Sequence, residues 1–415
     1  MLRLRSVVSA ATAAALCCAL LPAQQLQVYV LVGQSNMQGH AKVQTFDYLG
    51  DDPKTAPLLA RMRDDDGAPV VLDDVRIAYL TGGRDGDQEV TGKLTAGFGA
   101  RRNPQQSDDK IGPEFTFGLR MAERHDGPVL LIKCAWGGKS LHTDFRPPSA
   151  GPYPFSEQQL AQIAERHRHE KRKGPSVEQA KADKLAKTGR YYRSTIAYVQ
   201  KVLADLKAYH PDYDAEAGYQ LGGFVWFQGW NDMVDRGTYP ARDRAGGYDR
   251  YSECLAHFIR DVRKDLDAPK LPFVIGVMGV GGPVEAGQKR AVHQNFRDAM
   301  AAPAAMQEFL GNVAAVPTDP YWSQELDEIG QRIGKVQQMA RMLRTENQRG
   351  PNADGSMDKQ AQQAYLAKYR AEIVGAEDDA TYRRGASNGG YHYLGCAKTM
   401  AQIGVAFADA VHALR

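Results

Sequence analysis

A small polar cluster follows the first strongly apolar segment of the chain. The run 26–32 leads into Gly33, and Ser35 and Asn36 come next, ahead of a second glycine at Gly39. The glycines permit a tight turn from a strand into a helix, where a serine hydroxyl lies beside backbone N–H groups that stabilise an anion. Serine and asparagine are also common helix caps, so the motif alone is consistent with a nucleophile or an ordinary cap.

Later apolar segments end in residues that would complete an acyl-transfer site around Ser35. A glycine pair containing Gly138 follows one segment, while Gln228 and Asp232 lie at the end of another. His392 precedes the last helical pattern. Acyl transfer needs a serine that attacks, a histidine that takes and returns the proton, and N–H donors for the oxyanion. These residue types therefore favour the nucleophile interpretation.

The elements that must position these residues follow a regular order. Five continuously apolar segments predict strands buried on both faces, as in a parallel sheet: 26–32, 128–135, 222–228, 272–280 and 312–318. Helical patterns separate them at 113–125, 192–210, 248–266, 289–302 and 395–415. This alternation predicts an α/β fold: a three-layer α/β/α sandwich with a mostly parallel, doubly wound sheet of about five strands. Its ligands should bind at the carboxyl ends of the strands.

Two stretches interrupt the alternation. Residues 47–110 are polar and rich in glycine, and residues 155–190 are charged and helix-prone. We expect both to be insertions in a single domain over 24–415. The basic run inside 155–190 is interpreted as a solvated helix face, since the chain as a whole is nearly neutral.

The N-terminus has the pattern of an export signal. Arg3 and Arg5 precede an apolar run that is short for a membrane span, and a small residue suits cleavage at the end of 1–23. A cleaved signal peptide predicts an exported (periplasmic or secreted) protein without stable membrane insertion. An uncleaved anchor and a lipoprotein anchored at Cys17 or Cys18 are the alternatives.

The charge and the cysteines exclude several classes of protein. Loss of 1–23 would lower the formal net charge from +3 to +1, which leaves no electrostatic footprint for nucleic acid. Cys134, Cys254 and Cys396 would remain, and we expect three buried thiols in preference to one disulfide. No metal-ligand spacing and no phosphate-binding glycine loop is found, so neither a metal nor a cofactor is expected.

Four motifs together carry a family resemblance. "GQSNMQG", "AWGGKSL", "WFQGWND" and "YHYLG" occur in this order between residues 33 and 395. The sequence thereby resembles the SGNH-type hydrolases, and within them the sialate O-acetylesterase-like group that includes the sixth family of carbohydrate esterases. The resemblance implies the three-layer fold already expected and the removal of O-acetyl groups from sugars or glycans.

The resemblance also implies roles for individual residues. Ser35 matches the family nucleophile, and His392 matches the general base. Gly138 matches the oxyanion glycine, which the N–H of Ser35 would assist. Gln228 matches the polar side chain that completes the oxyanion hole.

The chain departs from the family pattern at two positions. Trp230 stands where the third motif often has glutamate, and Gly389 stands where many members have an aspartate three residues before the histidine. The acid that should orient His392 is therefore missing from its usual place. Asp232 is the first candidate and Asp319 the second, while a dyad oriented by a backbone carbonyl is the third possibility.

Other residues near the expected site have simpler interpretations. Asn36 and Trp230 are expected to contact the substrate, Trp230 by stacking on a sugar ring. Trp226 is interpreted as core and His40 as structural. His142 is interpreted as an exposed loop residue in preference to one that lines the pocket.

The sequence thus predicts an exported serine esterase that deacetylates a sugar or polysaccharide through an acyl-serine intermediate without a cofactor. A lipase or thioesterase of the same fold acting on longer acyl chains is one alternative. A carbohydrate-binding relative that lost its catalytic acid is the other.

Overall fold

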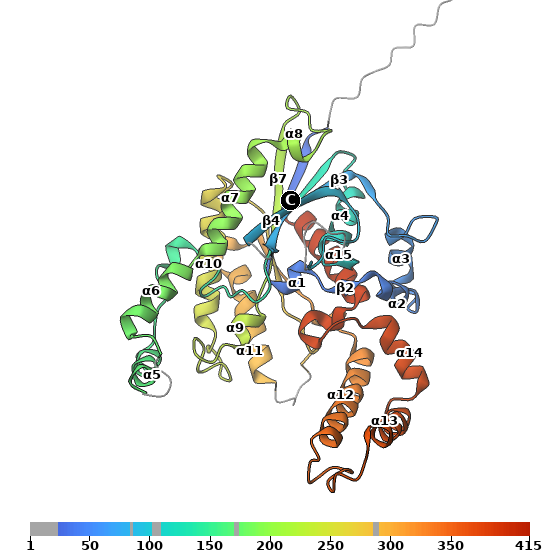
Figure 1. The fold of residues 1–415 in the computed structure, drawn as a ribbon. Coiled ribbons are helices and arrows are strands. Elements are labelled where there is room, and N and C mark those ends of the chain that lie inside the picture. The colour runs from blue at the N-terminus through green and yellow to red at the C-terminus, as the bar shows by residue number, and fades with distance from the viewer. Residues whose placement is uncertain (1–23, 84–85, 102–108, 170–173, 285–289) are drawn as a thin grey trace, which may run out of the picture.

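A seven-stranded sheet with β1 at its centre organises the molecule (Figure 1). The computed structural model describes residues 24–83, 86–101, 109–169, 174–284 and 290–415. The strand order is β4-β3-β6-β1-β7-β8-β9, and neighbouring strands are parallel except for the antiparallel pair β3–β4. The predicted mostly parallel α/β fold is therefore confirmed, although its sheet has seven strands and not five.

The strands of this sheet are β1 (Leu26–Gly33), β3 (Leu72–Gly83), β4 (Gly86–Leu94), β6 (Val129–Ala135), β7 (Tyr219–Phe227), β8 (Phe273–Val277) and β9 (Val313–Pro317). A separate two-stranded ladder joins β2 (Ala41–Lys42) to β5 (Lys110–Ile111). Every residue of β1 and β6 is buried, which explains why their sequences are apolar without alternation.

The two additional strands, β3 and β4, come from the stretch 47–110 that was expected to be an insertion. β4 lies at the edge of the sheet, where most of its side chains are exposed or only half-buried. An edge strand needs no continuous apolar run, and its polar, glycine-containing sequence therefore resembles a loop. The antiparallel hairpin extends the sheet beside β6.

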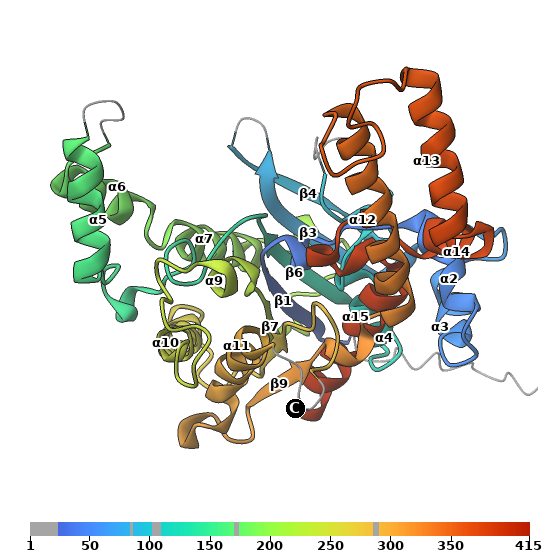
Figure 2. The same cartoon turned by 90° about the horizontal axis from the view of Figure 1, so that it is seen from below.

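Helices cover both faces of the sheet (Figures 1 and 2). α4 and α15 pack on one face, and α7, α10 and α11 lie on the other. The α-helices are α1 (Ser35–Gln38), α2 (Asp47–Gly50), α3 (Ala56–Met62), α4 (Glu114–Ala122), α5 (Glu157–Arg168), α6 (Val177–Lys187), α7 (Arg190–Ala204), α8 (Leu206–Tyr209), α9 (Trp230–Val234), α10 (Asp249–Asp265), α11 (Ala291–Ala301), α12 (Gln324–Arg344), α13 (Lys359–Ile373), α14 (Ala376–Gly385) and α15 (Ala397–Ala413). The 3-10 turns are η1 (Val43–Thr45), η2 (Pro148–Ala150), η3 (Ala302–Ala305), η4 (Gln307–Phe309), η5 (Asp319–Tyr321) and η6 (Gly390–Gly395).

Two pairs of helices extend away from the three layers, on opposite sides of the molecule (Figure 2). The pair α5–α6 corresponds to the expected insertion at 155–190 and contains no buried residue. The pair α12–α13 was not expected, and with α14 it surrounds a small apolar cluster of its own, formed by Ile329, Val336 and Val374.

The predicted signal peptide, residues 1–23, lies outside the described residues. Within the described ranges, no helix combines the length and the apolar character that crossing a membrane requires.

Lys133 of β6 has a fully buried ammonium group. Its Nζ lies 2.8 Å from Glu114 Oε2, and it donates to the carbonyl oxygens of Gln38 at 2.9 Å and Phe98 at 2.8 Å. Glu114 Oε1 in turn accepts the N–H of Gly112. Because Gln38 is the last residue of α1, the buried Lys133 ties the end of α1 to β6.

We expect Lys133→Met to lower the free energy of unfolding by about 3–5 kcal/mol, because it leaves the Glu114 carboxylate buried without its partner. Replacing both partners, as Lys133→Met with Glu114→Leu, should recover most of this loss. Chemical denaturation of both variants measures the difference. A loss below about 1 kcal/mol in the single variant would contradict this role.

Candidate active site

The carboxyl ends of the three central strands meet at one point of the sheet edge. Gly33, the last residue of β1, pairs with Ala135 of β6 and with Phe227 of β7. A Cβ atom at Gly33 would lie 2.1 Å from the carbonyl oxygen of Phe227, so only glycine allows this close approach. The residues after each strand are therefore neighbours, as the sequence predicted for the expected site.

Ser35 is the first residue of α1 and is largely buried, with 8% of its surface exposed. Its Oγ makes a long contact of 3.5 Å with Nε2 of Gln34. Within the part of the chain that the structure describes, the N–H of Ser35 donates no hydrogen bond, as expected for the first residue of a helix. Ser35 thus combines a hydroxyl and an uncommitted N–H donor.

The loop after β6 passes directly over this serine. A Cβ atom built on Gly137 would lie 3.9 Å from the Cβ of Ser35. Gly138 has a left-handed backbone with φ of 71°, and nothing lies within 4 Å of the position that its side chain would occupy. Among the described residues, the N–H of Gly138 has no acceptor. Gly138 therefore has an uncommitted N–H in the loop beside Ser35, and its role as oxyanion donor stays a prediction.

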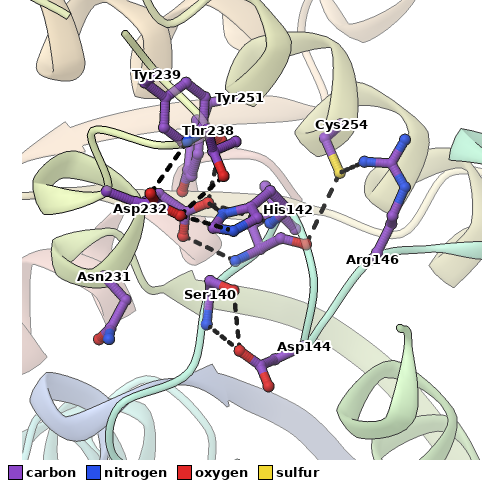
Figure 3. Close-up of polar contacts among 12 residues, drawn as sticks. Ser140, His142, Asp144, Arg146, Asn231, Asp232, Thr238, Tyr239, Tyr251 and Cys254 are labelled. Carbon is purple, nitrogen blue, oxygen red and sulfur yellow. Dashed lines mark hydrogen bonds and ion pairs between the residues drawn. The ribbon is translucent and has the colours of Figure 1, made fainter. Parts of the chain in front are cut away.

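The carboxylate of Asp232 accepts five hydrogen bonds in a fully buried position (Figure 3). Backbone N–H groups of Leu141 and His142 donate to it at 2.8 and 3.1 Å. His142 Nδ1 lies 2.8 Å from Oδ1, Gln228 Nε2 donates to Oδ2 at 2.6 Å, and the Tyr239 hydroxyl donates at 3.1 Å. Asp232 thereby ties the loop after β6 to the end of β7.

This arrangement differs from the expectation that Asp232 orients His392. The partner of Asp232 is His142, which is buried and not an exposed loop residue as predicted. The other ring nitrogen of His142, Nε2, lies 3.1 Å from Oδ2 of Asp235. Burial alone lowers the pKa of His142, but the charges and hydrogen bonds of Asp232 and Asp235 outweigh it and raise the pKa to about 9. At neutral pH His142 is therefore a cation between two carboxylates.

The amide of Gln228 is also committed within the protein. Its Nε2 contacts Asp232 Oδ2, the carbonyl oxygen of Lys139 at 3.0 Å and Oε1 of Gln34 at 3.1 Å. An amide carries only two hydrogens, so none remains for an oxyanion in this arrangement. This differs from the expected role of Gln228 as an oxyanion donor and makes it a bridge between the strand tips.

Asn231 is linked to Ser35 through the side chain of Gln34. Its Oδ1 accepts from Nε2 of Gln34 at 3.2 Å, and the same Nε2 contacts Ser35 Oγ. Figure 3 shows the Asn231 side chain on the side of Asp232 facing away from His142. Asn231 thus presents an amide at the tip of β7, where a polar donor was expected.

His392 belongs to η6, which packs against α1. Its Nδ1 lies 3.0 Å from Oδ1 of Asn388, and its ring stacks on that of His40, with centroids 3.8 Å apart and planes at 3°. Burial lowers the pKa of His392 to about 4, so the imidazole is neutral at neutral pH. Among the hydrogen bonds of the described residues, none joins His392 to Ser35 directly. Such bonds are often long before substrate binds.

The backbone after His392 adopts an unusual conformation. Tyr393 and Leu394 have φ angles of 52° and 60°, in the left-handed region that non-glycine residues rarely occupy. The Tyr393 hydroxyl is 2.6 Å from Oγ1 of Thr318 and accepts the N–H of Gly279 at 2.7 Å. The tips of β8 and β9 therefore hold a strained turn that carries the imidazole.

The remaining predicted residues lie around these groups. Asp319, the second candidate acid, has its carboxylate 3.7 Å from Nη1 of Arg297. Trp226 is fully buried, as predicted, whereas Trp230 is half-buried with its ring centroid 6.1 Å from that of Tyr391. Asn36 is buried, and its Oδ1 has no hydrogen-bond partner among the described residues.

The three cysteines outside the N-terminal segment, Cys134, Cys254 and Cys396, are free and buried, as predicted. Across the described ranges, His, Cys, Asp and Glu side chains form no group of three or more that could hold a metal ion.

A serine at the end of a central strand, beside free backbone donors and a turn that carries a neutral histidine, is an arrangement typical of hydrolases that use a serine nucleophile. The family model described as "Carbohydrate esterase, sialic acid-specific acetylesterase" matches residues 25–321 of this chain. The chain therefore belongs to the sialic acid-specific acetylesterase family of carbohydrate esterases and is a carboxylic ester hydrolase. The match includes Ser35, Gly138 and Gln228, while His392 lies beyond its end.

Several solved structures are similar to this chain at low sequence identity. A protein from Arabidopsis thaliana is 16% identical with a TM-score of 0.36, and the match covers 71% of this chain and 85% of that one. NanS is 14% identical with a TM-score of 0.38, covering 74% and 80%. A carbohydrate acetylesterase from Xanthomonas citri is 13% identical with a TM-score of 0.35, covering 70% and 49%. Among curated proteins, no match to this chain is found.

Sequence reasoning did not identify Asn388 or the true environment of His142. Asn388 lies four residues before His392, one position away from the place where the family pattern has an acid. The signal that could have identified Asn388 is an amide side chain next to the position where the family pattern has its acid. His142 has no comparable signal, because its partners Asp232 and Asp235 lie about ninety residues away in sequence.

We expect the stability of the protein to fall between about pH 6.5 and 9 because of His142. Its pKa is raised on folding, so its contribution is complete below the unfolded value of 6.5 and is lost as the pH rises through about 9. The loss is on the order of 3 kcal/mol. Chemical denaturation at several pH values measures this effect. Between about pH 6.5 and 9, the free energy of unfolding of His142→Gln should change less with pH than that of the parent protein.

The exposed His167→Gln serves as the control and should keep the pH dependence of the parent protein. Identical slopes for His142→Gln and the parent protein would contradict a charged His142.

Proposed function

We propose that this protein is an exported serine acetylesterase that removes O-acetyl groups from a carbohydrate through an acyl-serine intermediate. The observation that carries the proposal is the convergence of Ser35, the Gly137–Gly138 loop and the His392 turn at one point of the sheet edge. Family membership supports the acetylated carbohydrate as substrate.

In the proposed reaction, Ser35 Oγ attacks the acetyl carbonyl carbon while Nε2 of His392 takes the hydroxyl proton. The resulting oxyanion receives hydrogen bonds from the N–H groups of Ser35 and Gly138, both of which lack acceptors among the described residues. The side chain of Asn231 replaces Gln228 as the third donor. His392 then protonates the departing sugar oxygen as its bond to the acetyl carbon breaks, which frees the sugar hydroxyl. A water molecule deprotonated by the same base then attacks the acetyl-serine, and acetate leaves as the proton returns to Ser35 Oγ.

The low pKa of His392, about 4, keeps this base neutral over most of the pH range. A neutral imidazole is the form that can accept a proton.

Aromatic side chains beside His392 support a sugar as substrate. Tyr391 is half-exposed, and its ring centroid lies 4.4 Å from that of His392 and 6.1 Å from that of Trp230. Flat apolar rings suit the apolar face of a pyranose. We therefore retain Trp230 as a substrate contact and add Tyr391, whereas the burial of Asn36 does not support its predicted contact with the substrate.

Export rests on the N-terminal pattern alone. Residues 1–23 combine Arg3 and Arg5 with a short apolar run, which is typical of a cleaved signal peptide.

Ser35→Ala should lower kcat for an aryl acetate by roughly 10³-fold or more, because the nucleophile is removed while the fold is kept. Steady-state hydrolysis, together with labelling of the parent protein by a serine-directed organophosphate, measures this effect. The exposed Ser356→Ala, in the loop after α12, is the matched control and should behave as the parent protein. Substantial turnover by Ser35→Ala would exclude Ser35 as the nucleophile.

The competing proposal is a lipase or thioesterase that acts on longer acyl chains. An acetylesterase should have the highest kcat/KM for acetate in a series of aryl esters, with a decline through butyrate to octanoate. A preference for octanoate over acetate would favour the lipase interpretation.

A further inference from the structure

The side chain of Asn388 contacts the ring of His392 through its oxygen. Oδ1 of Asn388 lies 3.0 Å from Nδ1 of His392 and accepts the N–H of Gly389 at 2.7 Å. Because this atom already accepts the Gly389 N–H, it is the carbonyl oxygen and not the amide nitrogen that faces the imidazole. An amide oxygen only accepts, so Nδ1 of a neutral His392 carries the hydrogen and Nε2 keeps its lone pair.

The plane of the imidazole is held as well. His40 stacks in parallel on one side of the ring at 3.8 Å, and Tyr391 contacts it edge-on at 66°. The backbone N–H groups of Ser387 and Asn388 both donate to the carbonyl oxygen of Leu394, at 2.8 and 2.9 Å. The turn is therefore closed on itself, and Asn388 moves together with the histidine it contacts.

The carboxylates that were candidates for this position are engaged elsewhere. Asp232 is paired with His142, and Asp319 lies 3.7 Å from Arg297. In the described chain, Asn388 is thus the side chain bonded to Nδ1 of His392.

We propose that Asn388 is the positioning residue of His392. Its side-chain oxygen takes the place of the carboxylate that orients the base in a serine triad, and it selects the tautomer whose Nε2 accepts the proton of Ser35. The inference rests on the proposed function, in which His392 is the base. An acid would do the same and would also stabilise the imidazolium by its charge, which a neutral amide does not.

The electrostatic surroundings of His392 make this distinction measurable. α1, β2, α12 and α15 pack against η6. The titratable His40, between α1 and β2, stacks on the ring of His392, and η6 itself adds Tyr391. Burial alone accounts for the low pKa of His392, and among the described residues no charged group contributes to it. A carboxylate placed at residue 388 would be an opposite charge within hydrogen-bond distance and would raise that pKa by about 1–3 units.

Two variants test the proposal with an aryl acetate as substrate. Asn388→Leu removes the acceptor at similar volume and should lower kcat by about 10²-fold with little change in KM, since tautomer control is lost. Asn388→Asp keeps both accepted hydrogen bonds and should remain active, with the acid limb of its kcat/KM profile about 1–3 pH units higher than that of the parent protein. A purely structural role would not move this limb.

Asn347→Leu is the matched control, because Oδ1 of Asn347 likewise accepts a nearby backbone N–H, that of Arg349, in the loop after α12. It should match the parent protein in kcat and in its pH profile. An Asn388→Leu variant with kcat within about twofold of the parent, or an Asn388→Asp variant with an unmoved acid limb, would overturn the inference. Activity that survives Ser35→Ala would instead overturn the proposed function, so the two failures are distinguishable.

Discussion

The site depends on the buried carboxylate of Asp232. Its five hydrogen bonds join the loop after β6, the end of β7 and the side chains that lie between them. A charged group in such a position is tolerated only when it is paired and fully hydrogen-bonded, and the cationic His142 and the donors around it meet that condition. The loop carrying Gly138 is thereby fixed over Ser35 before any substrate arrives.

A second buried charge supports the other side of the site. Lys133 holds the end of α1 through the carbonyl oxygen of Gln38, whereas Asp232 acts on the loop opposite. Tyr393 adds a third attachment, since its hydroxyl holds the strained turn with His392 against the tips of β8 and β9. Rigid, buried polar contacts thus surround a small set of groups that stay uncommitted, which is the arrangement that preorganised catalysis requires.

Much of this architecture was predictable because parallel strands buried on both faces have continuous apolar sequences. All five predicted strands are present, and the residues that follow them meet at one edge of the sheet, as the doubly wound order requires. The hairpin β3–β4 escaped prediction because an edge strand such as β4 is mostly exposed and has a polar sequence. The helices α12–α14 escaped it because their small apolar cluster is separate from the main core.

The sequence by itself determined the fold class, the position of Ser35 after the central strand, and the neighbourhood of Gly138 and His392, because these follow from hydrophobic patterning and strand order. Only the tertiary structure decided which polar groups pair. Asp232 binds His142, Gln228 is committed within the protein, and Asn388 contacts His392. Hydrogen bonds depend on distances of a few tenths of an ångström between residues that can lie far apart in the chain, and patterning carries no information at that scale.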